Sequence, residues 1–160
     1  YQCLYYGYTF QDEYNPYSTH KDKKEFKENI RNENYVEALT QAEAILADDP
    51  FDLEAIYLMY YAHKELGNEE QAKIWQKQYT KLIETIFSSG DGQSVETAFV
   101  VNAVRDEYEI LAVLELKSTG QALVGKCDRI TLKTPNQYDI EEIYFNVEKP
   151  FESMTKMFKD

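Results

Sequence analysis

The sequence predicts an α+β protein in which two helical hairpins are followed by a four-stranded antiparallel β-sheet and a short C-terminal helix. The first observation is a repeated spacing, because Asn34 and Ala38 recur 34 residues later as Asn68 and Ala72. A period of this length is typical of stacked helix–turn–helix units. The second observation is that the spacing of apolar residues changes from about 3.6 to about 2 after residues 88–92. This change indicates a switch from helices to strands.

Residues 1–19 are expected to form the end of a helix followed by an aromatic-rich loop. Gly7 is expected to end the helix in the left-handed conformation, which glycine adopts without a Cβ clash. The tyrosine rings of this segment are expected to pack on the folded body with their hydroxyls in water. The alternative is a platform for carbohydrate, which requires two exposed and roughly coplanar rings. The candidate rings are Tyr5, Tyr6, Tyr8, Tyr14 and Tyr17.

Residues 20–90 are expected to form four helices. A side-chain oxygen of Ser18 or Thr19 can cap the first helix, and that of Asp52 can cap the third. Pro50 ends the second helix, because the residue before a proline is pushed out of helical conformation. The expected helices span residues 21–32, 35–47, 53–66 and 69–87.

Residues 91–160 are expected to form the sheet and the terminal helix, packed on the helical region as one unit. Tyr108, Ile110 and Ala112 alternate with other residues, as the side chains on one face of a strand do. Short links between successive strands favour an antiparallel meander. The expected strands span residues 97–104, 108–116, 121–132 and 143–147, and the expected helix spans residues 151–158.

The chain is strongly acidic, with a formal net charge of −12 from 29 acidic and 17 basic residues. Its basic cluster at residues 20–24 is short and is interrupted by Asp22. Binding to nucleic acid or to an anionic membrane surface is therefore not expected, whereas a cationic partner is favoured. No apolar run approaches the ~20 residues that span a bilayer, so no membrane insertion is expected. Cys3 and Cys127 could form a disulfide or remain two thiols, and the oligomeric state is left open.

No motif for catalysis, metal binding or cofactor binding is found, and the protein is not expected to be an enzyme. Cys127 is expected on a strand and His63 on a helix surface, without the local signature of a nucleophilic cysteine. Neither the acidic segment 48–52 nor the dipeptide Asp91-Gly92 matches a calcium-binding loop. The sequence also lacks the glycine motifs that bind phosphates. We therefore expect no cofactor and no metal.

Adjacent carboxylates are frequent in so acidic a chain and are expected to lie solvated at turns. The pairs are Asp48/Asp49, Asp106/Glu107 and Glu141/Glu142. Acid–base hydrolysis instead needs two carboxyls that face one cleft in different environments. The enzymatic alternative is a small hydrolase with a cleft between the helices and the sheet. It would place Cys127 or Asp128 against His63 or a second carboxylate, with perturbed titration.

The helical region 20–87 carries the pattern of a known repeat. Gly67 and Ala72 match that pattern, whereas His63 and Glu69 depart from it. The region thus resembles degenerate tetratricopeptide repeats, which implies stacked helices and protein–protein interaction. The repeat phase predicts four binding residues on the inner face of the third helix, namely Glu54, Tyr57, Tyr61 and Lys64. Aromatic side chains beside charges are typical of interface anchors. Alternatively, the two tyrosines pack against the sheet or the N-terminal loop.

Three further segments read LYYGYTFQDEYNPY at residues 4–17, GQALVGKCD at residues 120–128 and EIYFNV at residues 142–147. They resemble motifs of a domain-of-unknown-function family that is typical of Gram-negative gut bacteria. Members of that family commonly begin with a signal peptide. The resemblance implies a periplasmic, envelope-associated or secreted location and supplies no catalytic residues. Together with the repeats, it predicts an exported, non-enzymatic module that binds a protein or peptide or serves as a scaffold.

Overall fold

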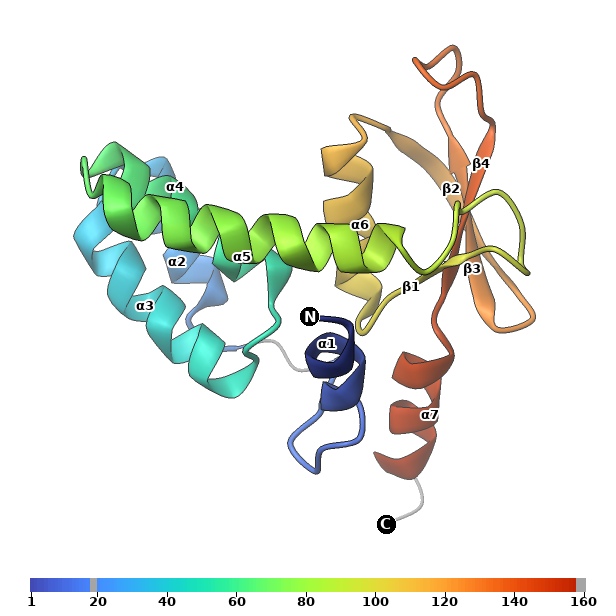
Figure 1. Ribbon diagram of the computed structural model, residues 1–160, viewed down its shortest axis with the longest axis horizontal. Coiled ribbons are helices and arrows are strands. Elements are labelled where there is room, and N and C mark those ends of the chain that lie inside the picture. The colour runs from blue at the N-terminus through green and yellow to red at the C-terminus, as the bar shows by residue number, and fades with distance from the viewer. Residues whose placement is uncertain (18–19, 158–160) are drawn as a thin grey trace. The chain divides into compact units, whose positions relative to one another are not determined.

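The computed structural model describes residues 1–17 and 20–157. Within these residues the chain forms seven helices and four strands, so the predicted α+β fold is confirmed (Figure 1). The helices are α1 (Gln2–Tyr8), α2 (Lys23–Arg31), α3 (Tyr35–Asp48), α4 (Leu53–Glu65), α5 (Glu69–Phe87), α6 (Val104–Val113) and α7 (Glu148–Met157). The strands are β1 (Phe99–Val100), β2 (Ser118–Val124), β3 (Cys127–Leu132) and β4 (Glu142–Asn146).

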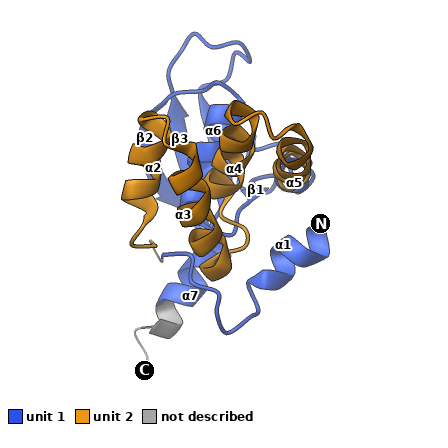
Figure 2. Cartoon of the chain, turned by 90° about the vertical axis from the view of Figure 1, so that its left-hand side faces the viewer, with its two compact units in different colours: residues 1–17, 83–160 blue, residues 18–82 orange. Residues whose placement is uncertain are grey.

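The chain divides into two compact units, which Figure 2 shows in different colours. Unit 1 contains residues 1–17 and 83–160, and unit 2 contains residues 18–82. The division falls inside α5, so this helix contributes residues to both units. The N-terminal segment groups with the sheet, although the whole of unit 2 separates the two in the sequence. That the regions 20–90 and 91–160 pack together as one unit stays a prediction.

Unit 2 has a hydrophobic core of its own, formed by residues of α2, α3 and α4. Ala38, Ala42 and Ala55 are fully buried in it, and such small side chains allow the helices to approach closely. Phe26 fills the core, and Trp75 of α5 packs against it. All four expected helices are present, with ends within two residues of the predicted positions. No helix in the described part of the chain is both long and apolar enough to cross a membrane.

The ends of the helices in unit 2 follow the local sequence. The predicted Asp52 cap is confirmed, since its Oδ1 accepts a hydrogen bond from the Ala55 N–H at 3.0 Å. Gly67 follows α4 with a φ of +73°, a left-handed conformation that favours glycine. Ser18 and Thr19, the predicted caps of α2, lie outside the described residues.

The four strands form one sheet in the order β1-β4-β3-β2. β2 pairs with β3 and β3 pairs with β4 in antiparallel fashion, as predicted. β1 instead runs parallel to β4, with Phe99 opposite Phe145. The sheet is therefore mixed. Between β1 and β2 the chain passes through a helix, which returns it to the end of the sheet at which a strand of the same direction can begin.

The predicted strand 108–116 is wrong, because residues 104–113 form the helix α6. Tyr108, Ile110 and Ala112 alternate as they would on one face of a strand, but the same segment also has the spacing of a helix. In α6 the buried residues are Asp106, Glu107, Ile110 and Leu111, which have the spacing of one helical face. Two of these four are carboxylates, so a search for apolar residues alone could not find that face.

The other elements of the second half correspond more closely to the prediction. The predicted strand 121–132 is a hairpin of β2 and β3 with a turn at Gly125-Lys126. The predicted strand 97–104 is shortened to β1, and β4 and α7 lie where a strand and a helix were expected. Phe158, the last residue of the predicted terminal helix, lies outside the described residues.

The N-terminal segment differs from the prediction in two ways. Gly7 lies inside α1, which continues to Tyr8, so the predicted left-handed end is wrong. The tyrosine hydroxyls bond to protein groups rather than to water alone: that of Tyr5 donates to Asp106 Oδ2 at 2.8 Å, and that of Tyr14 donates to the Asn102 carbonyl. The rings of Tyr8 and Tyr14 meet at 84°. Of the five tyrosines proposed for carbohydrate stacking, Tyr17 is exposed and the others are buried or half-buried, so no coplanar platform is formed by them.

Candidate functional site: an aromatic helix face and a buried carboxyl pair

The four predicted binding residues all lie on α4, in unit 2. Tyr57 and Lys64 are exposed, and Glu54 and Tyr61 are half-buried. The opposite side of α4 carries the buried residues Leu53, Ala55, Ile56, Met59 and Ala62. The repeat phase thus selects the less buried side of α4.

Tyr57 belongs to a group of three rings on α4 and α5, which we call the tyrosine cluster (Tyr57, Tyr60 and Tyr79). The Tyr57 ring centroid lies 5.3 Å from that of Tyr79 and 6.0 Å from that of Tyr60. These separations are typical of favourable aromatic pairs. Tyr57 nevertheless remains 41% exposed. The cluster therefore presents aromatic surface that its own packing holds in place.

Tyr61 makes a separate pair with Tyr35 of α3. The two ring centroids are 6.0 Å apart and the rings meet at 76°. Loss of solvation and a hydrogen bond with Tyr61 raise the pKa of Tyr35 to about 12. The Tyr35 hydroxyl therefore remains protonated at neutral pH. Tyr57 and Tyr61 thus both contact aromatic residues of the helical region, and their packing against the sheet or the N-terminal loop stays an alternative prediction.

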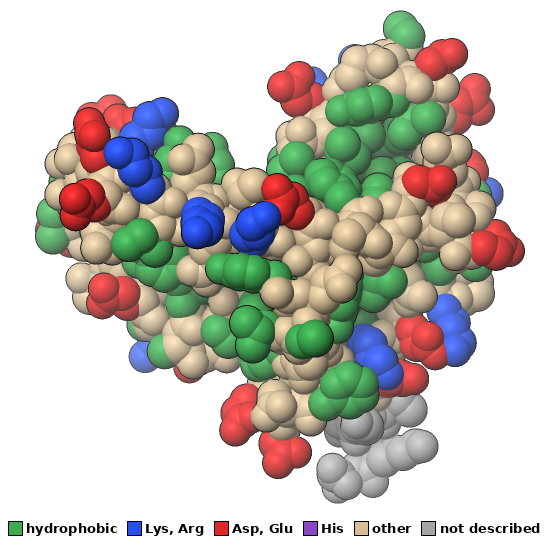
Figure 3. All heavy atoms as spheres, viewed as in Figure 1, with side chains coloured by type: hydrophobic (Ala, Val, Ile, Leu, Met, Phe, Trp, Pro, Cys, Tyr) green, Lys and Arg blue, Asp and Glu red, His purple; other side chains and the backbone are tan. Residues whose placement is uncertain are grey.

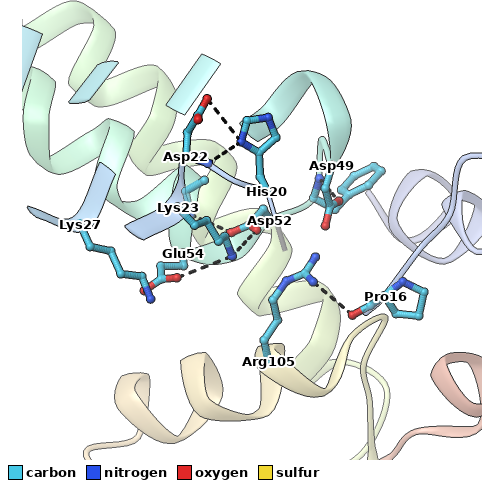
Figure 4. Close-up of polar contacts among 11 residues, drawn as sticks. Pro16, His20, Asp22, Lys23, Lys27, Asp49, Asp52, Glu54 and Arg105 are labelled. Carbon is cyan, nitrogen blue, oxygen red and sulfur yellow. Dashed lines mark hydrogen bonds and ion pairs between the residues drawn. The ribbon is translucent and has the colours of Figure 1, made fainter. Parts of the chain in front are cut away.

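Charged side chains surround the aromatic face, and Glu54 is engaged within unit 2. Its carboxylate lies 2.7 Å from Lys27 Nζ and 3.7 Å from Lys23 Nζ (Figure 4). Lys23 also pairs with the buried cap Asp52. Lys64 Nζ lies 6.0 Å from the Tyr60 ring centroid, at the limit of a cation–π contact. Glu54 thus has a structural role in tying α2 to α4, whereas Lys64 extends the exposed face.

The second candidate site lies in unit 1, where α6 and β3 bring two carboxyl groups together. Glu107 of α6 is completely buried and Asp128 of β3 is 6% exposed. Gln121 of β2 covers them, donating from Nε2 to Asp128 Oδ2 at 2.7 Å and approaching Glu107 Oε2 at 3.5 Å. Tyr108 in turn donates to Gln121 Oε1 at 3.1 Å. We call Glu107 and Asp128 the carboxyl pair.

The carboxyl pair holds a proton at neutral pH. Burial, followed by the charge of Asp128 and a hydrogen bond with it, raises the pKa of Glu107 to about 9. Glu107 Oε1 accepts no hydrogen bond from the described residues. A protonated Glu107 can instead donate to the Asp128 carboxylate. Glu107 is therefore a protonated carboxylic acid at neutral pH, held next to the side chain of Asp128.

Asp106, the other carboxylate at the start of α6, accepts hydrogen bonds that stabilise the structure. Its Oδ2 accepts hydrogen bonds from the Tyr5 hydroxyl at 2.8 Å and from the Ala103 N–H at 3.2 Å. The second bond satisfies a free donor at the N-terminus of the helix. Burial, followed by the charge of Asp106, raises the pKa of Tyr5 well above its usual value. The prediction that Asp106 and Glu107 lie solvated at a turn is wrong, because tertiary packing covers both.

The remaining candidates for catalysis gain little from the structure. His63 lies on α4 in unit 2, and Cys127 lies buried on β3 in unit 1. Burial raises the pKa of the Cys127 thiol, which disfavours the thiolate that a nucleophile needs. Cys3 and Cys127 are free cysteines. Across the described residues, no group of three or more His, Cys, Asp and Glu side chains could hold a metal ion.

Sequence reasoning placed the α4 residues on one helix face and named Asp128 with a second carboxylate as part of the hydrolase alternative, but it did not identify Glu107 as that carboxylate. Glu107 and Asp128 meet because the helix α6 packs on the sheet, and no spacing along the sequence specifies such a contact. A usable signal was present nonetheless. Glu107, Ile110, Leu111 and Leu114 follow the i, i+3, i+4, i+7 spacing of a helix, and that spacing would have placed Glu107 on the buried face.

Comparison of the chain with curated proteins and with solved structures finds no significant match. Comparison with sequence models of protein families finds one whose match extends over residues 1–156. This match includes all three segments that resemble family motifs and both candidate sites. The chain therefore belongs to the family described as Domain of unknown function (DUF4919).

Proposed function

We propose that this protein is a non-enzymatic module that binds a protein or peptide through the exposed face of α4. The observation that carries the proposal is the tyrosine cluster, in which Tyr57 is supported by two neighbouring rings and is still 41% exposed. Large side chains that are already fixed lose little conformational entropy when a partner covers them. Tyrosine is also enriched among the residues that dominate interface energies.

The helix arrangement supports the same function. The helices α2, α3, α4 and α5 follow one another along the chain with short links, and Asn34 and Ala38 recur 34 residues later as Asn68 and Ala72. This period supports a tetratricopeptide-like organisation of two helix pairs. The resemblance to such repeats implies protein–protein interaction. The net charge of −12 favours a partner with a cationic surface, because it speeds the encounter of opposite charges.

We further propose that the module acts in the cell envelope or outside the cell. The support is the resemblance of residues 4–17, 120–128 and 142–147 to motifs of exported proteins of Gram-negative gut bacteria. Envelope material is therefore the first place to look for the partner.

The test compares two single substitutions of tyrosines with the same exposure. Tyr57→Ala removes the centre of the tyrosine cluster, and Tyr17→Ala removes a ring in unit 1 that is also 41% exposed. Purified wild type and both variants are coupled to resin and used to capture partners from an envelope extract. The affinity of each captured partner is then measured with the purified components. We expect Tyr57→Ala to weaken binding by at least ~10-fold and Tyr17→Ala to leave it unchanged.

A partner held equally by all three proteins would contradict the proposed face. Loss of binding in Tyr17→Ala alone would place the binding surface on the N-terminal segment of unit 1 instead of α4. Thermal unfolding of each variant shows whether the fold is retained. Tyr61→Ala provides a second substitution on α4 that leaves the tyrosine cluster intact.

A small hydrolase is the second candidate, and the carboxyl pair is the observation that favours it. Glu107 holds a proton beside the Asp128 carboxylate, which is the division of roles that acid–base hydrolysis uses. We rank it second because Glu107 is fully buried and Gln121 covers the pair. If the pair is catalytic, Glu107→Gln lowers the turnover of chromogenic glycosides or esters by ~100-fold or more and leaves capture through Tyr57 unchanged. Absence of turnover by the wild type would contradict this candidate.

A further inference from the structure

Unit 1 contains an open cavity of about 450 Å³, a volume in the range of small-molecule sites. On the face shown in Figure 3, hydrophobic side chains gather below the tip of the loop between β3 and β4. The apolar lining comes from five different segments of the chain. It consists of Phe87, Phe99, Leu114, Tyr138, Ile140 and Ile143. Phe99 and Ile143 are buried and form the floor, whereas Tyr138 is 49% exposed.

The wall made by the loop between β3 and β4 is held by side-chain hydrogen bonds. Asn136 Nδ2 donates to the Ile140 carbonyl, and Asn136 Oδ1 accepts from the Tyr138 N–H at 3.2 Å. Gln137 Nε2 donates to the Leu114 carbonyl at the end of α6. These bonds fix the backbone that carries the two lining residues of the loop. The wall is thus formed before a ligand arrives.

The opposite wall is the loop after α5, which is bonded to the sheet. The Gly92 carbonyl accepts from the Tyr144 N–H at 2.9 Å, and the Gly92 N–H donates to the Thr97 carbonyl at 2.8 Å. Ser89 Oγ accepts from the Val100 N–H at 2.8 Å. This loop places Asp91 on the lining of the cavity.

Asp91 is the one charged residue of the lining, and it is exposed. Its Oδ1 accepts from the Gln93 N–H at 3.0 Å, and its carboxylate is also bonded to the side chain of Thr97. The Thr97 bond, followed by the Gln93 bond, lowers the pKa of Asp91, so the group is ionised at neutral pH. Gln93 is the other polar side chain of the lining, and no lysine, arginine or histidine contributes to it. A ligand therefore meets one negative charge and no positive charge.

We propose that this cavity binds a small organic amine, with an aromatic or branched aliphatic body in the cavity and its ammonium group at Asp91. The apolar lining removes the body of the ligand from water, and the carboxylate pairs with the ammonium group. The aromatic side chains of Phe87 and Tyr138 add apolar area to this lining. The site lies in unit 1 and does not depend on the α4 face, so the two proposals stand or fall separately.

The test uses three probes of nearly equal shape that differ in charge. Tryptamine is cationic, indole-3-ethanol is neutral and indole-3-propionate is anionic at pH 7. Each is titrated into protein whose isoleucine and leucine methyl groups are isotopically labelled, and binding is followed by NMR. We expect tryptamine to bind most tightly and indole-3-propionate least. The shifts should concentrate at Leu114, Ile140 and Ile143, and Ile45 in the core of unit 2 should not respond.

Two substitutions separate the contribution of charge from that of shape. Asp91→Asn should weaken tryptamine binding by about 3- to 10-fold, as expected for an exposed ion pair, and leave indole-3-ethanol unaffected. Glu96→Gln, an exposed acid in the same loop that does not line the cavity, is the matched control. Ile140→Trp fills the cavity and should abolish binding of all three probes, and Tyr138→Ala is the alternative if that variant does not fold. Absence of shifts with every probe, or equal affinity for tryptamine in Asp91→Asn, would overturn the proposal.

Discussion

Glu107 is an acid whose proton is retained by the folded protein and lost by the unfolded chain over a wide pH range. Its pKa is raised from 4.5 to about 9 by burial and by the neighbouring Asp128. Between these two values the folded state binds one more proton than the unfolded state. The free energy of unfolding therefore decreases as the pH rises, by at most about 1.4 kcal/mol per pH unit for this group.

The first prediction concerns Glu107→Gln, which imitates the protonated form at every pH. Wild type should lose stability steadily from pH 5 to pH 9, whereas the variant should lose much less. The measurement is the free energy of unfolding in urea at pH 5, 7 and 9. The exposed Glu37 provides the control, since Glu37→Gln should keep the wild-type pH dependence. Parallel profiles for wild type and Glu107→Gln would show that Glu107 is ionised in the folded protein.

At the scale of elements, two glycines adopt the left-handed backbone conformation in two different loops. Gly125 begins the turn between β2 and β3 with a φ of +62°, and nothing lies within 4 Å of a Cβ built on it. Gly92 has a φ of +69°, and a Cβ there would lie 2.6 Å from the Phe99 ring and 3.1 Å from Ile143. At both positions the left-handed backbone conformation disfavours any residue with a side chain. At Gly92 the contacts with neighbouring side chains disfavour it as well.

The second prediction compares Gly92→Ala with Gly125→Ala. Gly125→Ala should cost about 1 kcal/mol, from backbone strain alone. Gly92→Ala should cost roughly 2–4 kcal/mol, because overpacking against Phe99 adds to the strain. It should also disturb the floor of the cavity and weaken tryptamine binding. Urea unfolding of the two variants checks the difference, and equal costs would show that the loop at Gly92 relaxes freely.

On the scale of the whole molecule, α5 is the element that the two units share. Its residues 69–82 belong to unit 2 and its residues 83–87 to unit 1. Trp75 packs against the core of unit 2, and Ile86 is fully buried in the part that belongs to unit 1. The helix is continuous across the division. Its integrity should therefore matter to both units.

The third prediction tests this with the exposed residue Thr80, in the interior of α5. Thr80→Pro removes a helical hydrogen bond and clashes with the preceding turn, at a cost of ~3 kcal/mol or more. We expect faster amide hydrogen exchange in α4 of unit 2 and in β4 of unit 1. Thr80→Ala keeps the helix and should leave the exchange of both elements near that of wild type. Faster exchange in only one of the two elements would mean that α5 does not couple them.

The helices of unit 2 and the face of α4 could be predicted because their signals are local. The cap Asp52 and the small residues Ala38 and Ala42 act within one or two turns of the chain, and the 34-residue period can be read from the sequence directly. β4 was found for the same reason, since Ile143 and Phe145 alternate cleanly. The tyrosine cluster could be predicted only in part. The sequence placed Tyr57 on the binding face of α4, but the contact between Tyr57 and Tyr79 joins two different helices.

By itself the sequence determined the fold class, the positions of the long helices and the side of α4 that carries Tyr57 and Lys64. These follow from spacing along the chain, which sets the face on which a side chain stands. Only the tertiary structure decided that Glu107 meets Asp128 and that Asp91 borders an apolar cavity. Each depends on groups from distant segments. Burial next to such groups determines whether a carboxyl group is protonated, and no short segment of the sequence contains that information.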